Sequence, residues 1–374
     1  MSDNSILIIG AGPLGLSCAL MLAGSGIRAR VVDARPSPGQ DGRMLALSEG
    51  SRQILARLHA WPEGATPIEH IHISQQGGFG RATLHAHDHG LAALGQVLPA
   101  ADLAHHLLRA CDAAGIAIEY GVRIASVTTD AHTAQAHCAD GRVMEARLLV
   151  RAEGSVEETT RLIERDYQQD AILCSATPAK PHGQTAFERF TPQGPFALLP
   201  MGAGFSVVAT APRAQADALL ALPDADFLAM LQNAFGSRVT LTQVGPRSRY
   251  PLKLRARREI AGQRVAWLGN AAQTLHPVAG QGFNLALRDA WSLASLIARH
   301  PEADPGGPDL LARFSASRRL DRASTIGFTD ALIRVFANHD PLLNAARGVG
   351  LLGLAMIPPA RDFLARRMMF GLRG

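Results

Sequence analysis

The chain has 374 residues, of which 47% are hydrophobic and 18% are charged, and its formal net charge is +5. This length suits two interleaved domains, and this composition excludes an intrinsically disordered chain. The four cysteines are scattered without the spacing of metal ligands, so we expect reduced thiols and no metal site.

The first predicted elements are a strand over residues 5–9 and an apolar helix over residues 16–22, joined by a glycine-rich turn. The turn has the order Gly-x-Gly-x-x-Gly and consists of Gly10, Ala11, Gly12, Pro13, Leu14 and Gly15. Gly10 permits a tight turn, Gly12 lets backbone N–H groups approach a pyrophosphate, and Gly15 allows the helix to pack closely on the strand. This succession indicates a dinucleotide site.

A second predicted strand, residues 28–33, ends in Asp33. This carboxylate follows the glycine turn at about the spacing at which an acid accepts a hydrogen bond from a ribose hydroxyl. It favours a nucleotide with a free 2′-hydroxyl, as in FAD or NAD, over tightly bound NADP.

The residue pattern changes along the middle of the chain. Residues 102–114 have helical periodicity with Asp102 as the candidate N-cap. Strands are predicted over residues 122–128, 133–138 and 143–150, with a hairpin turn at Asp140-Gly141. From residue 168 to 252, proline and glycine separate short apolar runs, which predicts an antiparallel sheet with a helix near residues 224–235.

The chain then returns to its first pattern, with a strand over residues 264–268, a turn at Gly269 and a helix over residues 282–299. We therefore expect an α/β fold with four parts. They are a Rossmann-like domain whose first part is 1–167, an inserted antiparallel-sheet substrate domain over 168–252, a return segment of the first domain over 253–300, and a helical C-terminal region over 301–374.

Five blocks between residues 6 and about 292 carry a family resemblance. They are the Gly10 turn, Arg43 to Arg52, Phe187 to Pro200, Tyr250-Pro-Leu, and Gly269 to Asp289. In this order they resemble the FAD-dependent aromatic hydroxylases with the p-hydroxybenzoate hydroxylase fold, and within them the ubiquinone-biosynthesis hydroxylases that act on polyprenyl phenols. The resemblance implies a monooxygenase that uses FAD, O₂ and NAD(P)H as transient electron donor. It also implies hydroxylation of the aromatic ring through a flavin C4a-hydroperoxide.

The resemblance implies which residues hold the FAD. Arg43 matches an arginine near the flavin and pyrophosphate, with a solvated loop arginine as the alternative, and Asn270 holds the position that bonds the ribityl chain. Small residues from Pro277 to Gly282 suit close approach of backbone N–H groups to the ring. Asn284 and Asp289 lie on the following helix, where a structural role is the alternative. The expected cofactor-binding residues are Gly10, Gly12, Pro13, Gly15, Asp33, Arg43, Gly269, Asn270, Pro277, Gly280, Gln281, Gly282 and Asn284.

Histidines supply the remaining candidates for chemistry. His276 lies beside residues 277–282, the predicted flavin loop, and could orient the substrate or relay a proton from the phenol. The alternative is a histidine hydrogen-bonded to the backbone at a turn before proline. His85, His87 and His89 alternate along a possible strand, but no carboxylate or cysteine cluster accompanies them, which favours a solvated face over a metal site.

One segment departs from the family pattern. Where members have Gly-Ala-Asp-Gly followed by Ser and Arg, this chain has Arg151-Ala-Glu153-Gly154, and the usual arginine is displaced to Arg161. Because that motif is linked to pyridine nucleotide and to flavin pyrophosphate, the electron donor is less firmly predicted than FAD. An FAD-binding accessory subunit of a quinone-biosynthesis assembly is the alternative function. A plain NAD-dependent dehydrogenase would leave the Gly269 block unexplained.

The C-terminus suggests how a lipid-tailed substrate is reached. Residues 348–357 are apolar but too short to span a bilayer, and residues 360–370 mix arginines with apolar side chains as an interfacial helix does. The alternative is a tail that packs on the substrate domain or on a partner subunit. No signal peptide is visible, so we expect a cytoplasmic protein, peripheral at the inner face of the membrane. Expected partners are a polyprenyl phenol and O₂, together with the membrane surface or other quinone-biosynthesis proteins, and without nucleic acid.

Overall fold

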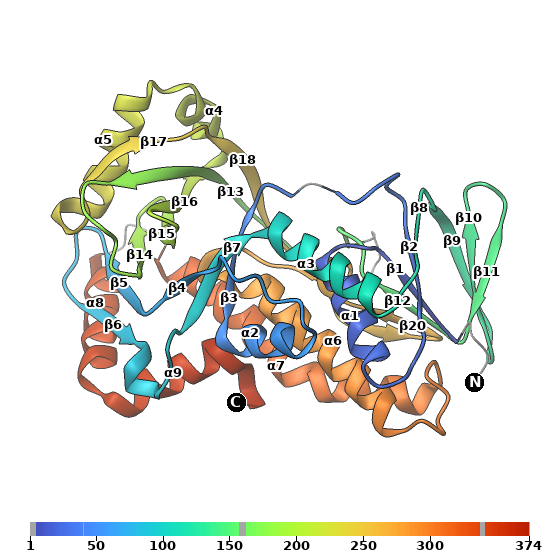
Figure 1. Ribbon diagram of the computed structural model, residues 1–374. Coiled ribbons are helices and arrows are strands. Elements are labelled where there is room, and N and C mark those ends of the chain that lie inside the picture. Colours follow the sequence, from blue (N-terminus) through green and yellow to red (C-terminus); the bar gives the residue numbers. More distant parts are fainter. Residues whose placement is uncertain (1–4, 40, 157–161, 337–340, 374) are drawn as a thin grey trace.

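The computed structural model describes residues 5–39, 41–156, 162–336 and 341–373, and its described strands form four sheets. Figure 1 shows the largest sheet at one end of the molecule and a six-stranded sheet with its helices toward the other. The displaced Arg161 of the departing segment lies outside the described residues.

The six-stranded sheet has the Rossmann-like order predicted for the dinucleotide domain, and all neighbours except the first pair are parallel. In spatial order its strands are β19 (Ala261–Gly262), β20 (Val265–Trp267), β12 (Leu148–Arg151), β1 (Ile6–Ile9), β2 (Arg30–Asp33) and β8 (Ile118–Tyr120). The apolar run of β1 is buried throughout, as a central parallel strand covered on both faces requires. Helices α1 (Pro13–Ala23), α3 (Ala100–Ala113) and α6 (Gln281–Arg299) contribute to the same core.

The largest sheet has nine strands and is mainly antiparallel. In order they are β21 (Gln273–Thr274), β18 (Ser248–Arg257), β13 (Leu162–Pro178), β16 (Gly204–Pro212), β15 (Gly194–Met201), β14 (Thr185–Thr191), β5 (His70–Gln75) and β6 (Arg81–His85), while β17 (Leu241–Val244) pairs with β13. Helices α4 (Arg213–Ala221) and α5 (Asp224–Phe235) pack on it around Phe205 and Phe227. The sheet therefore takes in β5, β6 and β21 from outside residues 168–252.

Two small sheets and the remaining helices complete the described chain. The strands are β3 (Met44–Ser48), β7 (Gly95–Pro99) and β4 (Thr66–Ile68) in one sheet, and β11 (Val143–Ala146), β10 (Ala134–Cys138) and β9 (Ile124–Thr129) in the other. The helices are α2 (Glu49–Arg57), α7 (Pro308–Phe336), α8 (Pro341–Met356) and α9 (Pro358–Phe370). Short 3₁₀ turns are η1 (Ala86–His89), η2 (Gly236–Arg238), η3 (Gly269–Ala271), η4 (Val278–Gly280) and η5 (Gly371–Arg373).

Three local predictions are wrong. Residues 143–150 are not one strand, because the chain turns at Arg147 and leaves an antiparallel pair with β10 for a parallel pair with β1. Asp102 does not cap α3, which begins two residues earlier behind Pro99 without a side-chain cap. The three histidines do not alternate along a strand, since β6 ends at His85 and the next residues form η1.

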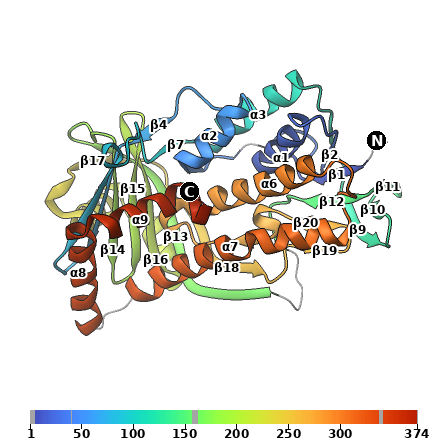
Figure 2. The same ribbon diagram turned by 90° about the horizontal axis from the view of Figure 1, so that it is seen from below.

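The C-terminal helices pack on the body rather than extend from it. In Figure 2 α7 runs beside α6, and α9 crosses toward the middle of the molecule. Ala365 and Met369 of α9 are buried in a cluster with Leu84 and Leu94. Among the described residues, no single helix has the length and hydropathy of a membrane span, although Ala345–Met356 and Pro358–Phe370 together meet that test across a 94° bend.

Candidate active site

The glycine turn at the start of α1 has the geometry that a bound pyrophosphate needs. Gly10 has a φ of +110°, and a Cβ there would lie 2.7 Å from the carbonyl oxygen of Ala152. A Cβ on Gly15 would collide with the carbonyl oxygen of Gly10. A Cβ on Gly12 would meet no atom within 4 Å. Gly10 and Gly15 are therefore required by packing, whereas Gly12 opens onto free space.

Asp33 is fixed beside this turn. Its Oδ2 accepts a hydrogen bond of 2.7 Å from the backbone N–H of Ala11, and Arg35 donates to the carboxylate from its backbone and guanidinium. Burial opposes ionisation of Asp33, but the hydrogen bonds from Arg35 and Ala11 outweigh it and hold the pKa below its usual value. The ribose contact of Asp33 stays a prediction, and a ribose hydroxyl there would have to share the carboxylate with Arg35.

The segment that begins at Gly269 packs against the helix that follows the Gly10 turn. A Cβ on Gly269 would collide with the side chain of Leu14, the second residue of α1, so η3 lies directly against that helix. Asn270 follows in η3, is partly exposed, and makes no hydrogen bond within the described chain. Its amide is thus available to a ligand, as the ribityl assignment requires.

The helix α6 begins in the same way as α1. Its N-cap is Gly280, which has a φ of +60° and offers no side-chain cap, and a Cβ on Gly282 would meet no atom within 4 Å. The N-cap of α1, Gly12, also lacks a side-chain cap. Two helix N-termini with open glycines therefore present backbone N–H groups and positive dipole ends, which suits the two anionic parts of FAD, its pyrophosphate and its N1–C2=O edge.

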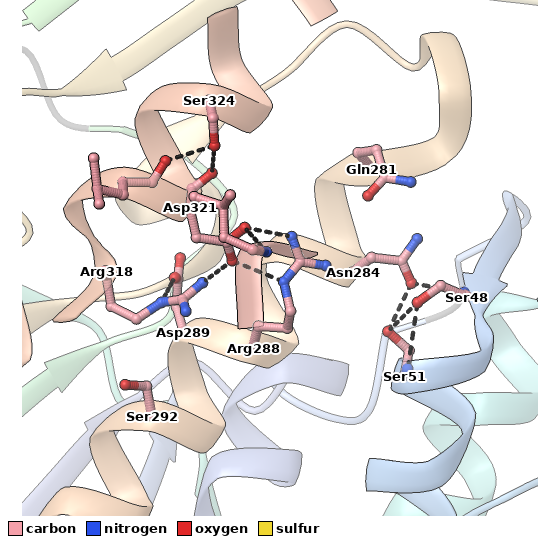
Figure 3. Close-up of polar contacts among 12 residues, drawn as sticks. Ser48, Ser51, Gln281, Asn284, Arg288, Asp289, Ser292, Arg318, Asp321 and Ser324 are labelled. Carbon is pink, nitrogen blue, oxygen red and sulfur yellow. Dashed lines mark hydrogen bonds and ion pairs between the residues drawn. The ribbon is translucent and has the colours of Figure 1, made fainter. Parts of the chain in front are cut away.

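Asn284 joins the two halves of this site. Its Oδ1 accepts hydrogen bonds from the Ser48 N–H at 2.9 Å and the Ser51 hydroxyl at 2.7 Å, and its Nδ2 donates to the carbonyls of Ala46 and Gly280 (Figure 3). An amide side chain can make about four hydrogen bonds, so none is left for a cofactor. We propose that Asn284 positions β3 and the flavin loop, in place of the direct contact expected from the sequence.

Asp289 has a structural role, which the sequence offered as the alternative to a cofactor contact. It is fully buried, and its carboxylate accepts hydrogen bonds from Arg318 at 2.6 Å and Gln273 at 2.9 Å. The carboxylate of Asp321 forms ion pairs with both Arg318 and Arg288, which extends the network between α6 and α7 (Figure 3). Since every charge in it is paired, removing one partner should leave an uncompensated buried charge and destabilise the fold.

Two arginines near the site pair with acids of their own segments. Arg43 forms an ion pair of 2.6 Å with Asp41, and its guanidinium lies 5.9 Å from the ring centre of Tyr250. Its proposed contact with the flavin or pyrophosphate would require that pair to open or to be shared. Arg151 forms an ion pair of 2.7 Å with Glu153, and Ala152 between them is the residue whose carbonyl faces Gly10. The altered family segment therefore neutralises its own charge.

His276 is buried, and its two ring nitrogens differ. Nδ1 accepts a hydrogen bond of 3.1 Å from the backbone N–H of Val278, so the ring proton lies on Nε2, which has no partner among the described residues. The ring packs edge-on against Tyr167. Burial lowers the pKa of His276 to about 3, so the ring stays neutral and can donate a hydrogen bond but cannot accept a proton near neutral pH.

This depressed pKa predicts an acid-sensitive contribution to stability. Below the ordinary histidine pKa of about 6.5, the unfolded chain binds a proton at His276 that the folded protein does not. The free energy of unfolding should therefore fall with falling pH between about 6.5 and 3, by at most about 1.4 kcal/mol per unit. Denaturant titrations of the native protein and of His276→Gln measure the difference, and equal slopes in both would contradict the burial of a neutral ring.

Comparison with known proteins decides what this site belongs to. A family model described as an FAD binding domain matches residues 3–328. The chain belongs to this FAD-binding family. Ubiquinone hydroxylase UbiL of Rhodospirillum rubrum is 32% identical over 98% of the chain and 90% of its own length. Ubiquinone hydroxylase UbiM of Neisseria meningitidis is 27% identical over 98% of the chain and 84% of its own length.

A solved structure shows the same fold. The p-nitrophenol 4-monooxygenase PnpA from Pseudomonas putida DLL-E4 superposes with a TM-score of 0.79 over 99% of both chains, at 16% identity. The resemblance stated from the sequence is confirmed, and the protein is an FAD-dependent monooxygenase. The block Arg43 to Arg52 was singled out from the sequence, but the bonds of its Ala46, Ser48 and Ser51 to Asn284 were not predicted, because no spacing marks a partner more than 230 positions away.

Proposed function

We propose that this protein hydroxylates the aromatic ring of a polyprenyl phenol in ubiquinone biosynthesis. The observation that carries the proposal is a pair of open glycines, Gly12 at the N-terminus of α1 and Gly282 in the first turn of α6, on helices whose N-termini lack side-chain caps. The ubiquinone hydroxylases to which the chain is similar over almost its whole length supply the substrate class.

The chain's own residues would bind the cofactor, orient the substrate and exclude water. When bound, FAD supplies the redox chemistry that activates O₂ for insertion into the ring. The N-terminus of α1 would bind its pyrophosphate, and the N-terminus of α6 would stabilise negative charge at the flavin ring. His276, which stays neutral, would donate its Nε2–H to a substrate or cofactor oxygen and so orient it. The apolar clusters around Val278 and Ile68 would keep water from the reacting atoms.

The alternative, an FAD-binding accessory subunit, is favoured only by the self-paired Arg151 and Glu153. Oxidation of NADPH and of NADH by the purified flavoprotein, with and without 2-farnesylphenol, separates the two. The hydroxylase shows oxidation stimulated by the phenol and a product with one more oxygen atom. A yellow protein that forms no hydroxylated product with either donor would instead fit the accessory subunit.

A small apolar cavity lies beside the first turn of α6. It has a volume of about 70 Å³ and lies where the first turn of α6 meets α9 and the small β3 sheet. Its lining includes Leu47, Ile71 and Leu84 from the sheets, Met368 from α9, and Gln281 from the flavin loop. This volume is well below the roughly 300 Å³ of a small-molecule pocket, so α9 would have to shift for an isoprenoid chain to leave the reaction centre here.

We further propose that the elbow between α8 and α9 rests on a membrane at the inner face. Val349, Met356 and Phe363 on these helices are 62%, 77% and 66% exposed, and Arg366 beside them is exposed. Exposed apolar side chains next to arginine, on a protein of net charge +5, match the apolar boundary and anionic surface of a bilayer.

Charged substitutions on the elbow should therefore weaken membrane binding. Met356→Glu combined with Phe363→Glu is expected to reduce sedimentation with phosphatidylglycerol vesicles by about tenfold or more, because both an apolar anchor and charge attraction are lost. Val143→Glu is the matched control, since Val143 is 51% exposed and begins β11, a strand at the end of the molecule opposite α8 (Figure 1). Equal sedimentation of all three proteins would contradict the docking surface. Deletion of the tail is a poorer test, because α9 is part of the core.

A further inference from the structure

One carboxyl group on the inner side of the large sheet has no partner. Glu188 of β14 is partly buried, and it forms no hydrogen bond or ion pair within the described residues. Burial alone raises its pKa to about 8. A carboxyl group held in apolar surroundings without a partner costs free energy, and groups of this kind are concentrated at functional sites.

Strand alternation shows which way this side chain points. Ala186, Glu188 and Phe190 share one face of β14. Ala186 packs in a cluster with residues of β4 and β7, and Phe190 packs with Val278 of the flavin loop. Phe187 lies on the opposite face, in the core beneath α5. Glu188 therefore faces the space between the small β3 sheet and the flavin loop, where the aromatic ring of a substrate must lie to meet the flavin.

The direct neighbours of Glu188 in the sheet register are apolar, and the polar Gln75 lies two residues further along β5 on the same face. In the sheet register it stands beside Ala197 of β15 and Ile73 of β5. The titratable groups on the surrounding elements include His276, which is neutral, and Tyr167, Arg165 and Arg334, which all contact the carboxylate of Asp330. Arg347 of α8 is also buried on this side, with its guanidinium 5.8 Å from the ring centre of Phe336. None of them contributes to the pKa of Glu188.

We propose that Glu188 is the base that accepts the phenol proton of the substrate, an inference that rests on the proposed hydroxylation of a phenol. The phenol O–H bond breaks, its proton moves to a carboxylate oxygen of Glu188, and the electron pair stays on the phenol oxygen. The resulting phenolate donates more electron density into the ring, which makes the ring a better nucleophile toward the activated oxygen. A phenol has a pKa of about 10, so a carboxylate of raised basicity is well matched to share its proton.

Replacement of the base by its isosteric amide tests this role. Glu188→Gln should lower kcat/KM for 2-farnesylphenol by about 100-fold, while the FAD content stays equal to that of the native protein. A fluorinated 2-farnesylphenol, whose hydroxyl group is more acidic, should recover most of this loss because it needs less help from a base. Glu145→Gln makes the same change at an exposed position of β11 and should behave as the native protein. A loss that is equal for both phenols would assign Glu188 a structural role and overturn the proposal.

Binding of the phenol to the oxidised holoenzyme provides a second test that needs no turnover. The Kd of 2-farnesylphenol, measured from the change in flavin absorbance, should fall as the pH rises from about 6 to 8, because the carboxylate form accepts the phenol hydrogen bond. In Glu188→Gln the Kd should not depend on pH over this range. A pH-independent Kd in the native protein would overturn the proposal. The expected pH dependence without any hydroxylated product would support the Glu188 contact and overturn the proposed hydroxylation instead.

Discussion

Gly12→Val should give a folded protein that is colourless on purification. A Cβ at Gly12 would meet no protein atom within 4 Å, and the φ of −79° there is extended backbone that valine adopts, so the fold should accept this substitution. We propose that, in the FAD complex, the pyrophosphate approaches the backbone in this same space at the start of α1. We expect FAD content to fall from stoichiometric to undetectable, as measured by absorbance of the flavin released on denaturation. Circular dichroism and thermal unfolding of the apoprotein check that the fold is retained.

Two neighbouring glycines provide the contrast. Ala substitutions at Gly10 and Gly15 bring a Cβ against backbone carbonyl oxygens, so both should lose stability as well as cofactor. Gly12→Val should therefore separate cofactor binding from folding in a way that the other two cannot. Stoichiometric FAD in folded Gly12→Val would reject the placement of the pyrophosphate at this turn.

Gly282→Leu should reduce hydroxylation much more than it reduces stability. The position is in the first turn of α6 and opens onto free space, so leucine is compatible with the helix but would displace a ring bound over it. Displacement by about 1 Å can cost about 100-fold in rate, and a disturbed cavity admits water to the activated oxygen. We expect a fall of this size in hydroxylated product, with hydrogen peroxide released per NAD(P)H oxidised in its place.

The matched control for this substitution is Gly327→Leu. Gly327 is an exposed helical glycine of α7, and a Cβ added there would likewise meet no atom within 4 Å. This variant should keep native coupling, so any general effect of leucine in a helix is subtracted. If Gly282→Leu also couples NAD(P)H oxidation to hydroxylation as the native protein does, the loop packs elsewhere and the assignment of the flavin ring is wrong.

The sequence predicted the parts of the fold that local pattern dictates. The glycine turn at Gly10, the helix after Gly280 and the hairpin at Asp140-Gly141 each follow from steric needs that a few residues express. Periodicity also placed α5 and α6 within a residue of their ends. The switch of sheets at Arg147 was missed because alternation looks the same in two strands joined by one residue.

Contacts made over long distances in the sequence could not be predicted. The four hydrogen bonds of Asn284 use backbone groups and serines of the Arg43 to Arg52 block, and nothing in that block indicates a partner on α6, so its role could be assigned only from the fold. The apolar surroundings of Glu188 come from β5, β15 and the flavin loop, which are distant in the sequence. The His276 ring was recognised as a candidate, but its tautomer and depressed pKa depend on a backbone N–H and on burial.

Analysis of quinone precursors in a strain that lacks this gene tests the central claim most directly. We expect the strain to accumulate a polyprenyl phenol that lacks one ring hydroxyl group, and to regain ubiquinone when the native gene is supplied. Gly12→Val should fail to restore it although the protein is folded. Normal ubiquinone in the deletion strain, without an accumulated phenol and with no second hydroxylase to replace it, would contradict ring hydroxylation as the function of this protein.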